Sequence, residues 1–293
     1  MRTLSIAGLQ IAPVAGDPEA TLERFVEQAA AVKRAIDHAQ LLVLPELHLS
    51  APPGILQEGR GHAERVATEV PGALTGRLEA LAAELGLWLV AGSVYERDDD
   101  GAIYNTALAI SPRQGVVAAY RKAFPWQPSE CTQPGNRFVV FDIDGVGRAG
   151  LAICYDGFFP ETFRQLAWLG AEVVFHPTLT TTSDRPAELI AARANAIFNQ
   201  VYVVNVNASS PAALGRSLVV DPDGIVRHQA GSGEELITAV LDLDAVERTR
   251  RYGTGGVSRM WRQLDSGAAA QRDLPMYANG RIQPHPAPAD TGG

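Results

Sequence analysis

The stretch GRAGLAICYDGFFPE, from Gly147 to Glu161, constrains the fold more than any other part of the sequence. Residues 149–153 predict a short apolar β-strand that delivers Cys154 to a sharp turn. Pro160 and Glu161, which follow the turn, are typical of the first turn of a helix. A strand that leads into a helix in this way indicates an α/β fold.

Two interpretations of Cys154 follow from this setting. The N-terminus of a helix carries a partial positive charge, which favours the thiolate over the thiol and predicts a reactive cysteine. A lone cysteine beside an apolar strand is also commonly a buried structural residue. The stretch by itself leaves both interpretations open.

Strand and helix alternate at residues 4–46 and again at residues 149–206, with hairpins between and after these segments. Residues 41–44 are wholly apolar, as in a strand that is covered on both faces. The predicted strands cover residues 4–11, 41–44, 87–94, 105–110, 116–121, 138–142, 149–153, 173–176, 201–206, 217–220, 225–228 and 236–241. The predicted helices cover residues 19–38, 74–85, 161–169 and 186–199, the last capped by Ser183 or Asp184, while residues 52–61 are predicted to form a loop. Sheets with helices outside them are the simplest architecture for this order.

No linker-like change in composition occurs within residues 1–281, so we predict a single domain there. Residues 282–293 form a tail rich in Pro, Gly and Ala, which we predict to be disordered.

Composition excludes several classes of protein. Of the 293 residues 46% are apolar and 20% are charged, as in a globular protein with a large core. The net charge of −8 has no long runs, which argues against nucleic acid or an anionic membrane as a partner, and neither a signal peptide nor a bilayer-spanning run is evident. Two cysteines indicate a reducing cytoplasm, and the scattered His and Cys residues lack the spacing of metal ligands.

Three reactive side chains each follow the end of an apolar strand: Glu46, Lys122 and Cys154. Catalytic residues of α/β folds gather at such ends, where loops meet over a rigid sheet. A base, a cation and a nucleophile together are sufficient for acyl transfer.

The motifs around these residues resemble the carbon–nitrogen hydrolase (nitrilase) superfamily. The resemblance rests on LPE at 44–46, YRK at 120–122 and ICYDG at 153–157, and extends through ELIAARANAIFNQVYVVNVNAS at 188–209. The loop YRKAFPWQPSECTQPG at 120–135 is most similar to the aliphatic amidase and formamidase branch. The resemblance implies a four-layer αββα sandwich, no cofactor or metal, and pairing through a helical face into a homodimer or a larger homo-oligomer.

The same resemblance implies roles for four residues. Cys154 attacks the amide carbon, and Glu46 takes the thiol proton and later activates water, which requires a raised pKa that burial would supply. Lys122 stabilises the oxyanion together with the backbone N–H of Tyr155. Glu130 matches a second glutamate that orients the substrate amide and the lysine; a loop-capping acid is the alternative.

Trp126, Tyr155, Phe158 and His176 are candidate walls of the substrate pocket, with core packing as the alternative for each. His176 could instead hydrogen-bond a backbone carbonyl. Cys131 lacks a comparable setting, and we assign it no catalytic role. Thr180, Thr181 and Thr182 replace bulky or polar family residues and would reshape the pocket.

Phe158 bears on the substrate. Amidases that bind a substrate carboxylate usually have an arginine at this position, so an apolar ring there favours a neutral substrate. Nitrilases usually have Trp-Glu after the cysteine, whereas this chain has Tyr155-Asp156. We therefore predict an amidohydrolase that cleaves a neutral small-molecule carboxamide to carboxylate and ammonia through a thioester. The alternatives are a nitrilase or N-carbamoyl amine hydrolase with the same triad, and a binding or regulatory protein that lost turnover.

Overall fold

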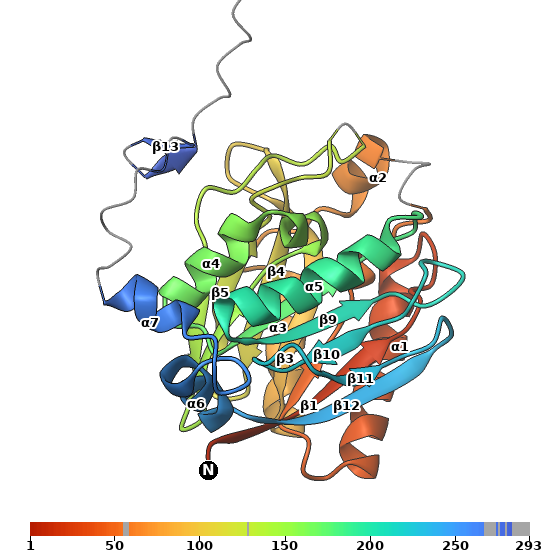
Figure 1. Ribbon diagram of the computed structural model, residues 1–293. Coiled ribbons are helices and arrows are strands. Elements are labelled where there is room, and N and C mark those ends of the chain that lie inside the picture. The colour runs from red at the N-terminus through yellow and green to blue at the C-terminus, as the bar shows by residue number, and fades with distance from the viewer. Residues whose placement is uncertain (55–58, 128, 267–273, 275, 279, 283–293) are drawn as a thin grey trace, which may run out of the picture.

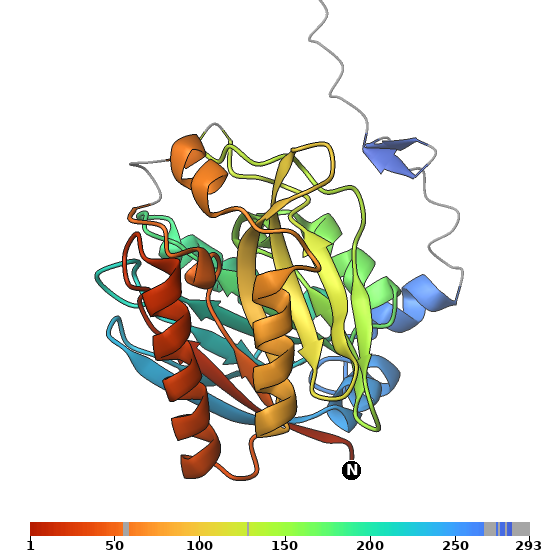
Figure 2. The same cartoon turned by 180° about the vertical axis from the view of Figure 1, so that it is seen from behind.

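Two β-sheets lie face to face, and helices cover their outer sides (Figures 1 and 2). The computed structural model describes residues 1–54, 59–127, 129–266, 274, 276–278 and 280–282. The four layers confirm the predicted αββα sandwich. Residues 283–293 of the predicted tail lie outside the described residues.

The first sheet has six strands in the spatial order β12-β1-β2-β3-β4-β5. The strands β1, β2 and β3 are parallel, and antiparallel pairs complete both edges. The bounds are β1 (Thr3–Gln10), β2 (Leu41–Val43), β3 (Trp88–Arg97), β4 (Ile103–Ser111), β5 (Gly115–Arg121) and β12 (Glu235–Asp242).

The second sheet repeats this plan, with the order β11-β10-β9-β8-β7-β6. Its central strands β7, β8 and β9 are parallel, and antiparallel pairs lie outside them. The bounds are β6 (Val140–Ile143), β7 (Gly147–Leu151), β8 (Val173–Thr178), β9 (Tyr202–Asn207), β10 (Leu218–Val220) and β11 (Val226–Gln229).

Helices α1 (Pro18–Ala35) and α3 (Ala73–Leu85) cover the first sheet (Figure 2), and α4 (Pro160–Trp168) and α5 (Arg185–Asn199) cover the second (Figure 1). The remaining elements are the 3₁₀ turns η1 (His48–Ser50) and η2 (Cys154–Phe158), the helices α2 (Gly59–Val66), α6 (Asp244–Tyr252) and α7 (Met260–Asp265), and the strands β13 (Tyr277–Ala278) and β14 (Arg281–Ile282). Among the residues that the structure describes, none of the helices combines the length and apolarity of a membrane span.

Strand β2 buries both of its faces, which explains its apolar sequence. Leu41 and Val43 point into the core between the sheets, whereas Leu42 and Leu44 point into the core under α1 and α3. Successive side chains of a strand alternate between its faces, so both sets are apolar only where both faces are covered.

Three local predictions were wrong. Asp184 stands at the N-cap of α5, but its side chain makes no capping hydrogen bond there. The strand predicted at residues 149–153 ends at Leu151, because the side chain of Asp156 accepts a hydrogen bond from the backbone N–H of Ile153 (2.9 Å) and draws the chain into η2. Helix α2 begins at Gly59, inside the predicted loop, because its sequence GRGHAERV has no apolar stripe to reveal it.

Candidate active site

The loops that leave β2, β5 and β7 meet at one end of the sandwich and enclose a cavity. Glu46, Lys122, Cys154 and Glu130 all line it, as the sequence predicted. The structure thus brings together a carboxylate, an ammonium and a sulfur that lie far apart in the chain. The other lining residues are Leu47, Tyr95, Trp126, Ser129, Cys131, Tyr155, Phe158, Leu179, Thr180, Thr181, Thr182, Asp184 and Glu188.

A glycine in β3 makes room for the turn that carries Glu46. Gly92 has φ +63° and lies where the pairing of β3 with β4 is irregular. A Cβ atom at this position would lie 1.9 Å from the carbonyl oxygen of Pro45. Only glycine permits this approach, which turns Glu46 toward the second sheet, where its N–H donates to the carbonyl of Thr178 (3.2 Å).

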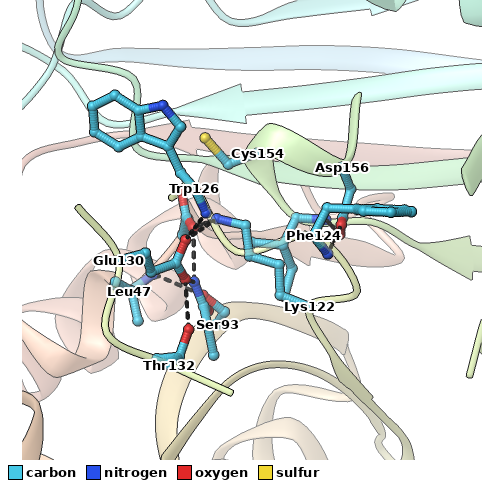
Figure 3. A network of polar contacts seen from close by, with 12 residues as sticks. Leu47, Ser93, Lys122, Phe124, Trp126, Glu130, Thr132, Cys154 and Asp156 are labelled. Atoms are coloured by element: carbon cyan, nitrogen blue, oxygen red, sulfur yellow. Dashed lines mark hydrogen bonds and ion pairs between the residues drawn. The ribbon is translucent and has the colours of Figure 1, made fainter. Parts of the chain in front are cut away.

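Lys122 lies between two carboxylates. Its Nζ is 3.0 Å from Oε1 of Glu46 and 2.7 Å from Oε2 of Glu130. The side chains of Lys122 and Glu130, from the loop after β5, lie near that of Cys154, which follows β7 (Figure 3). Because Lys122 and Glu46 are each 2% exposed, their charges interact with little screening by water.

Glu130 accepts four hydrogen bonds. Oε2 accepts from Lys122 and from the N–H of Trp126 (2.9 Å), and Oε1 accepts from Asn105 (2.9 Å) and Thr132 (3.0 Å) (Figure 3). Two acceptor sites on each carboxylate oxygen are thereby filled. Glu130 is therefore placed to orient Lys122.

Glu46 differs from Glu130 in one respect. Its Oε1 accepts from Lys122 and from Nδ2 of Asn105 (2.8 Å). Its Oε2 is buried and has no hydrogen-bond partner among the described residues. A buried carboxylate oxygen without a partner can accept a proton.

The two glutamates differ in acidity. Burial raises the pKa of Glu46 above its usual range, although Lys122 opposes this effect. This is the direction that a general base needs. Burial also disfavours the charge on Glu130, but Lys122 and the hydrogen bonds hold its pKa below its usual range. Burial works against the charge on Lys122, yet Glu130 and Glu46 raise its pKa well above the usual value.

Cys154 has φ +42°, a left-handed conformation that is uncommon for residues other than glycine. It begins η2, and α4 starts only at Pro160. Burial, followed by the charge of Glu46, raises the pKa of Cys154 well above its usual value. Burial and the charge of Glu46 therefore outweigh the helix dipole, which was predicted to favour the thiolate. The resting side chain is a thiol, and a base must remove its proton before it can attack.

Asp156 ties the loop of Cys154 to the loop of Lys122. Its Oδ2 accepts from Tyr120 (2.8 Å), and its Oδ1 accepts from the N–H of Phe124 (3.0 Å; Figure 3). Burial raises the pKa of Asp156 to about 7. This buried bridge fixes the separation between nucleophile and cation.

Of the candidate pocket walls, Trp126, Tyr155 and Phe158 line the cavity, but His176 does not. His176 lies beneath Cys154, where its Nε2 is 2.8 Å from the Cys154 carbonyl oxygen and its Nδ1 is 3.0 Å from Nδ2 of Asn205. Burial lowers the pKa of His176, so the neutral ring donates to the carbonyl and accepts from Asn205. The prediction that His176 forms a pocket wall was wrong, and its backbone hydrogen bond matches the alternative interpretation.

Comparison of the sequence with protein-family models identifies the family of this chain. Residues 5–251 match the model of the carbon-nitrogen hydrolase family. The chain belongs to this family. The resemblance inferred from the sequence motifs is therefore confirmed.

The relatives of this carbon–nitrogen hydrolase include amidases. Omega-amidase NIT2 of Homo sapiens is 30% identical over 85% of this chain and 91% of its own length. Deaminated glutathione amidase of Mus musculus is 34% identical over 62% of each chain, so the match spans less than two thirds of that relative.

Solved structures with the same fold include Nit3 of Saccharomyces cerevisiae, with a TM-score of 0.77 and 29% identity over 85% of this chain and 94% of that one. Another is an amidase variant from Nesterenkonia sp. AN1 that carries the acetamide moiety of fluoroacetamide on its active-site cysteine. It has a TM-score of 0.70 and 25% identity, and covers 85% of this chain and 94% of that one.

Sequence reasoning missed several polar residues of this carbon–nitrogen hydrolase, above all Asn105, Asp156 and Glu188. Each is buried, with at most 1% exposure. Asn105 offered a signal, because it is an amide side chain in the largely apolar stretch that forms β4. Glu188 offered none, because a glutamate in the first turn of a helix is usually solvated.

Proposed function

We propose that this carbon–nitrogen hydrolase cleaves a neutral carboxamide to a carboxylate and ammonia through a thioester on Cys154. One observation carries the proposal: a buried carboxylate oxygen without a partner, Oε2 of Glu46, shares a cavity with a protonated Cys154 and with Lys122.

In the first half of the reaction Oε2 of Glu46 takes the thiol proton as Sγ of Cys154 attacks the carbonyl carbon. Lys122 has three protons on Nζ, and it donates one to each glutamate, which leaves the third for the oxyanion. The backbone N–H of Tyr155 is the second donor that the family resemblance implies. The tetrahedral intermediate collapses to the thioester, and Glu46 returns the proton to the departing ammonia.

In the second half Glu46 removes a proton from water, and the resulting hydroxide attacks the thioester carbonyl. The carboxylate product leaves, and Cys154 regains its proton from Glu46. Glu130 has no open acceptor site for the substrate amide, so in this scheme it orients Lys122 alone.

The cavity supports a neutral substrate. Among the described residues that line it, Lys122 is the basic side chain, and both Glu46 and Glu130 already pair with it. Phe158, where a carboxylate-binding amidase would have arginine, lines the cavity instead. A substrate carboxylate would therefore be buried beside acidic groups without a free cation.

The relatives support amide hydrolysis, since they include omega-amidases and a deaminated glutathione amidase. The Nesterenkonia amidase, which was also solved with butyramide, supports a small amide and a reactive cysteine. Nothing specific in the cavity favours the nitrilase or N-carbamoyl hydrolase alternative, so both enter the test as competing substrates.

The test measures ammonia release from butyramide, from an amide of the same length with a terminal carboxylate, from butyronitrile and from an N-carbamoyl amine. We expect kcat/KM for butyramide to exceed that for the carboxylate analogue by at least about tenfold. The reason is that burying one unpaired charge costs at least the free energy that corresponds to about a tenfold change. Hydroxylamine should divert the reaction to a hydroxamate, since it attacks the thioester in place of water.

Cys154→Ala should abolish ammonia release while leaving the thermal unfolding midpoint near that of the parent protein. Lys33, the other lysine of the chain, donates to backbone carbonyls at the end of α1. Lys33→Ala is therefore the matched control for Lys122→Ala, which should lose about 100- to 1000-fold in kcat. Undiminished ammonia release by Cys154→Ala would refute the mechanism, and preference for the carboxylate analogue would refute the substrate class.

The assembly and the compartment are proposals of the same kind. We propose a cytoplasmic homo-oligomer, for which two observations give support. Both cysteines are free. Trp168 and Phe198, on α4 and α5, are 58% and 51% exposed, and large apolar side chains on one helical layer favour burial against a second copy. Light scattering tests the assembly, and a monomeric mass at micromolar concentration would contradict it.

A further inference from the structure

A second buried carboxylate is linked to Cys154 through the hydroxyl of Thr180. Glu188, in the first turn of α5, is 1% exposed and forms an ion pair with Arg185 (2.9 Å). Its Oε1 accepts from Asn205 (3.1 Å), and its Oε2 accepts from the hydroxyl of Thr180 (2.5 Å). The mechanism above uses neither Glu188 nor Thr180.

Thr180 connects this carboxylate to the nucleophile. Its Oγ1 lies 3.8 Å from Sγ of Cys154, within hydrogen-bonding range for sulfur. Its backbone is held on both sides by Asn207, which accepts from the N–H (2.8 Å) and donates to the carbonyl (3.3 Å). The hydroxyl therefore stands at a fixed place beside the sulfur.

The direction of the hydrogen bond follows from the carboxylate. A hydroxyl has one proton, and Thr180 gives it to Glu188, whose oxygens can only accept while the group is ionised. A lone pair of Oγ1 then faces Cys154, so the thiol is the donor. A thiolate would meet that lone pair and the negative charge of Glu188 behind it.

We propose that Glu188 and Thr180 are positioning residues that hold the resting Cys154 as a thiol and leave Glu46 to take its proton. The inference rests on the proposed function for its role in turnover, but the hold on the thiol is a property of the free protein. When a substrate arrives, the thiol leaves Thr180 and gives its proton to Oε2 of Glu46, which has no hydrogen-bond partner among the described residues of the free protein.

Charged and titratable groups face Cys154 from every neighbouring element. Glu46 and Glu188 favour the thiol, whereas Lys122 and a hydrogen bond from the N–H of Leu179 favour the thiolate. Around them lie Glu130, Asp156 and the neutral His176, which contacts the Cys154 carbonyl. Burial acts in the same direction as the two glutamates.

The experiment follows alkylation of Cys154 by iodoacetamide as a function of pH in the free protein. Trypsin releases Cys154 in the peptide of residues 149–164, apart from Cys131, so mass spectrometry reports this thiol alone. The variants are Thr180→Val, Thr180→Ser, Glu188→Gln and, as a matched control, Thr182→Val, whose parent hydroxyl donates to Asp184.

Thr180→Val should lower the midpoint pH of alkylation, because it removes the acceptor that favours the thiol. Glu188→Gln should lower the midpoint by about one unit, or about tenfold in thiolate at a given pH. Thr180→Ser and Thr182→Val should leave it unchanged. Ammonia release should fall at least about tenfold in Thr180→Val, through kcat, and return in Thr180→Ser.

A higher midpoint in Thr180→Val would overturn the proposal, because the hydroxyl would then donate to the sulfur. An unchanged midpoint in folded Thr180→Val and Glu188→Gln would reduce both residues to structural roles and overturn it as well. If Glu188→Gln fails to fold by circular dichroism, the two Thr180 variants decide the question. A parent protein that releases no ammonia from any amide contradicts the proposed function, while the alkylation series still decides this inference.

Discussion

At the scale of single residues, the two glutamates that pair with Lys122 have different roles. Glu130 uses every acceptor position for protein groups, whereas Glu46 keeps one buried oxygen free. The same cation therefore holds one carboxylate as a fixed anion and leaves the other to exchange protons. Glu46 and Glu130 are the same type of residue, and their different hydrogen-bond partners give them different pKa values.

The pH dependence of kcat/KM should reflect Glu46. Glu46 must be ionised to accept the thiol proton, so the rate should rise with pH through its pKa and be lost as pH falls through it. Because burial raises this pKa, the acidic limb should lie above the ordinary glutamate value of about 4.3. The pH–rate profile of the free enzyme measures it, and a limb at or below 4.3 in folded protein would exclude Glu46 as the base.

Glu130→Gln should lower kcat about 100-fold with a small change in KM. The amide offers one acceptor oxygen, and its NH₂ group would face donors: Lys122 and Trp126 N–H on one side, or Asn105 and Thr132 on the other. Lys122 would shift away from the oxyanion, and a displacement of about 1 Å has an effect of that size. Steady-state kinetics decide between this result and a rise in KM alone, which would instead assign Glu130 to substrate binding.

At the scale of elements, the site depends on how strands end. Leu47 and Cys154 have positive φ and turn the chain after β2 and β7, and Gly92 inside β3 leaves room for the first of these turns. Asp156 then joins the ends of β5 and β7. The catalytic side chains belong to loops, but short hydrogen bonds attach those loops to rigid strands.

Gly92→Ala should lower the free energy of unfolding by about 3 kcal/mol, because a methyl group would overlap the Pro45 carbonyl and alanine is strained at φ +63°. Activity should fall with it, since Pro45 precedes Glu46. Urea denaturation measures the stability. Gly76→Ala, in an exposed part of α3 with open space around it, is the control and should gain about 0.5–1 kcal/mol. Equal stability of the two variants would show that the approach at Gly92 is not required.

At the scale of the whole molecule, one core serves both sheets. Side chains such as Val90 and Tyr120 of the first sheet and Phe175 and Val204 of the second are buried in the same cluster. Arg2 adds a polar tie, since it bonds to Glu172 beside β8 (2.8 Å). Neither sheet could keep its inner face covered without the other.

The protein should therefore unfold in one transition, as the predicted single domain requires. Trp88 reports the first sheet and Trp168 the outer layer of the second, so tryptophan fluorescence samples both halves. We expect its urea curve to coincide with that of far-ultraviolet circular dichroism. Two separated transitions would divide residues 1–281 into independent units.

The sequence by itself determined the layers and the reactive groups of this protein. Apolar runs such as residues 41–44 predict strands that are buried on both faces. The reactive residues Glu46, Lys122 and Cys154, which follow strand ends, predict where the loops form a catalytic site. Both signals are local, because alternation and chain order act within a few residues.

Only the tertiary structure decided the protonation states and the supporting polar groups. The pKa of Cys154 rises because burial and Glu46 outweigh Lys122, which no local pattern contains. His176 lies beneath the nucleophile and not, as the sequence had predicted, in the wall of the pocket. Asn105 and Glu188, which the sequence analysis did not predict, are hydrogen-bonded to residues of the site. Hydrogen bonds and charges act through space, so their balance exists only once distant strands have come together.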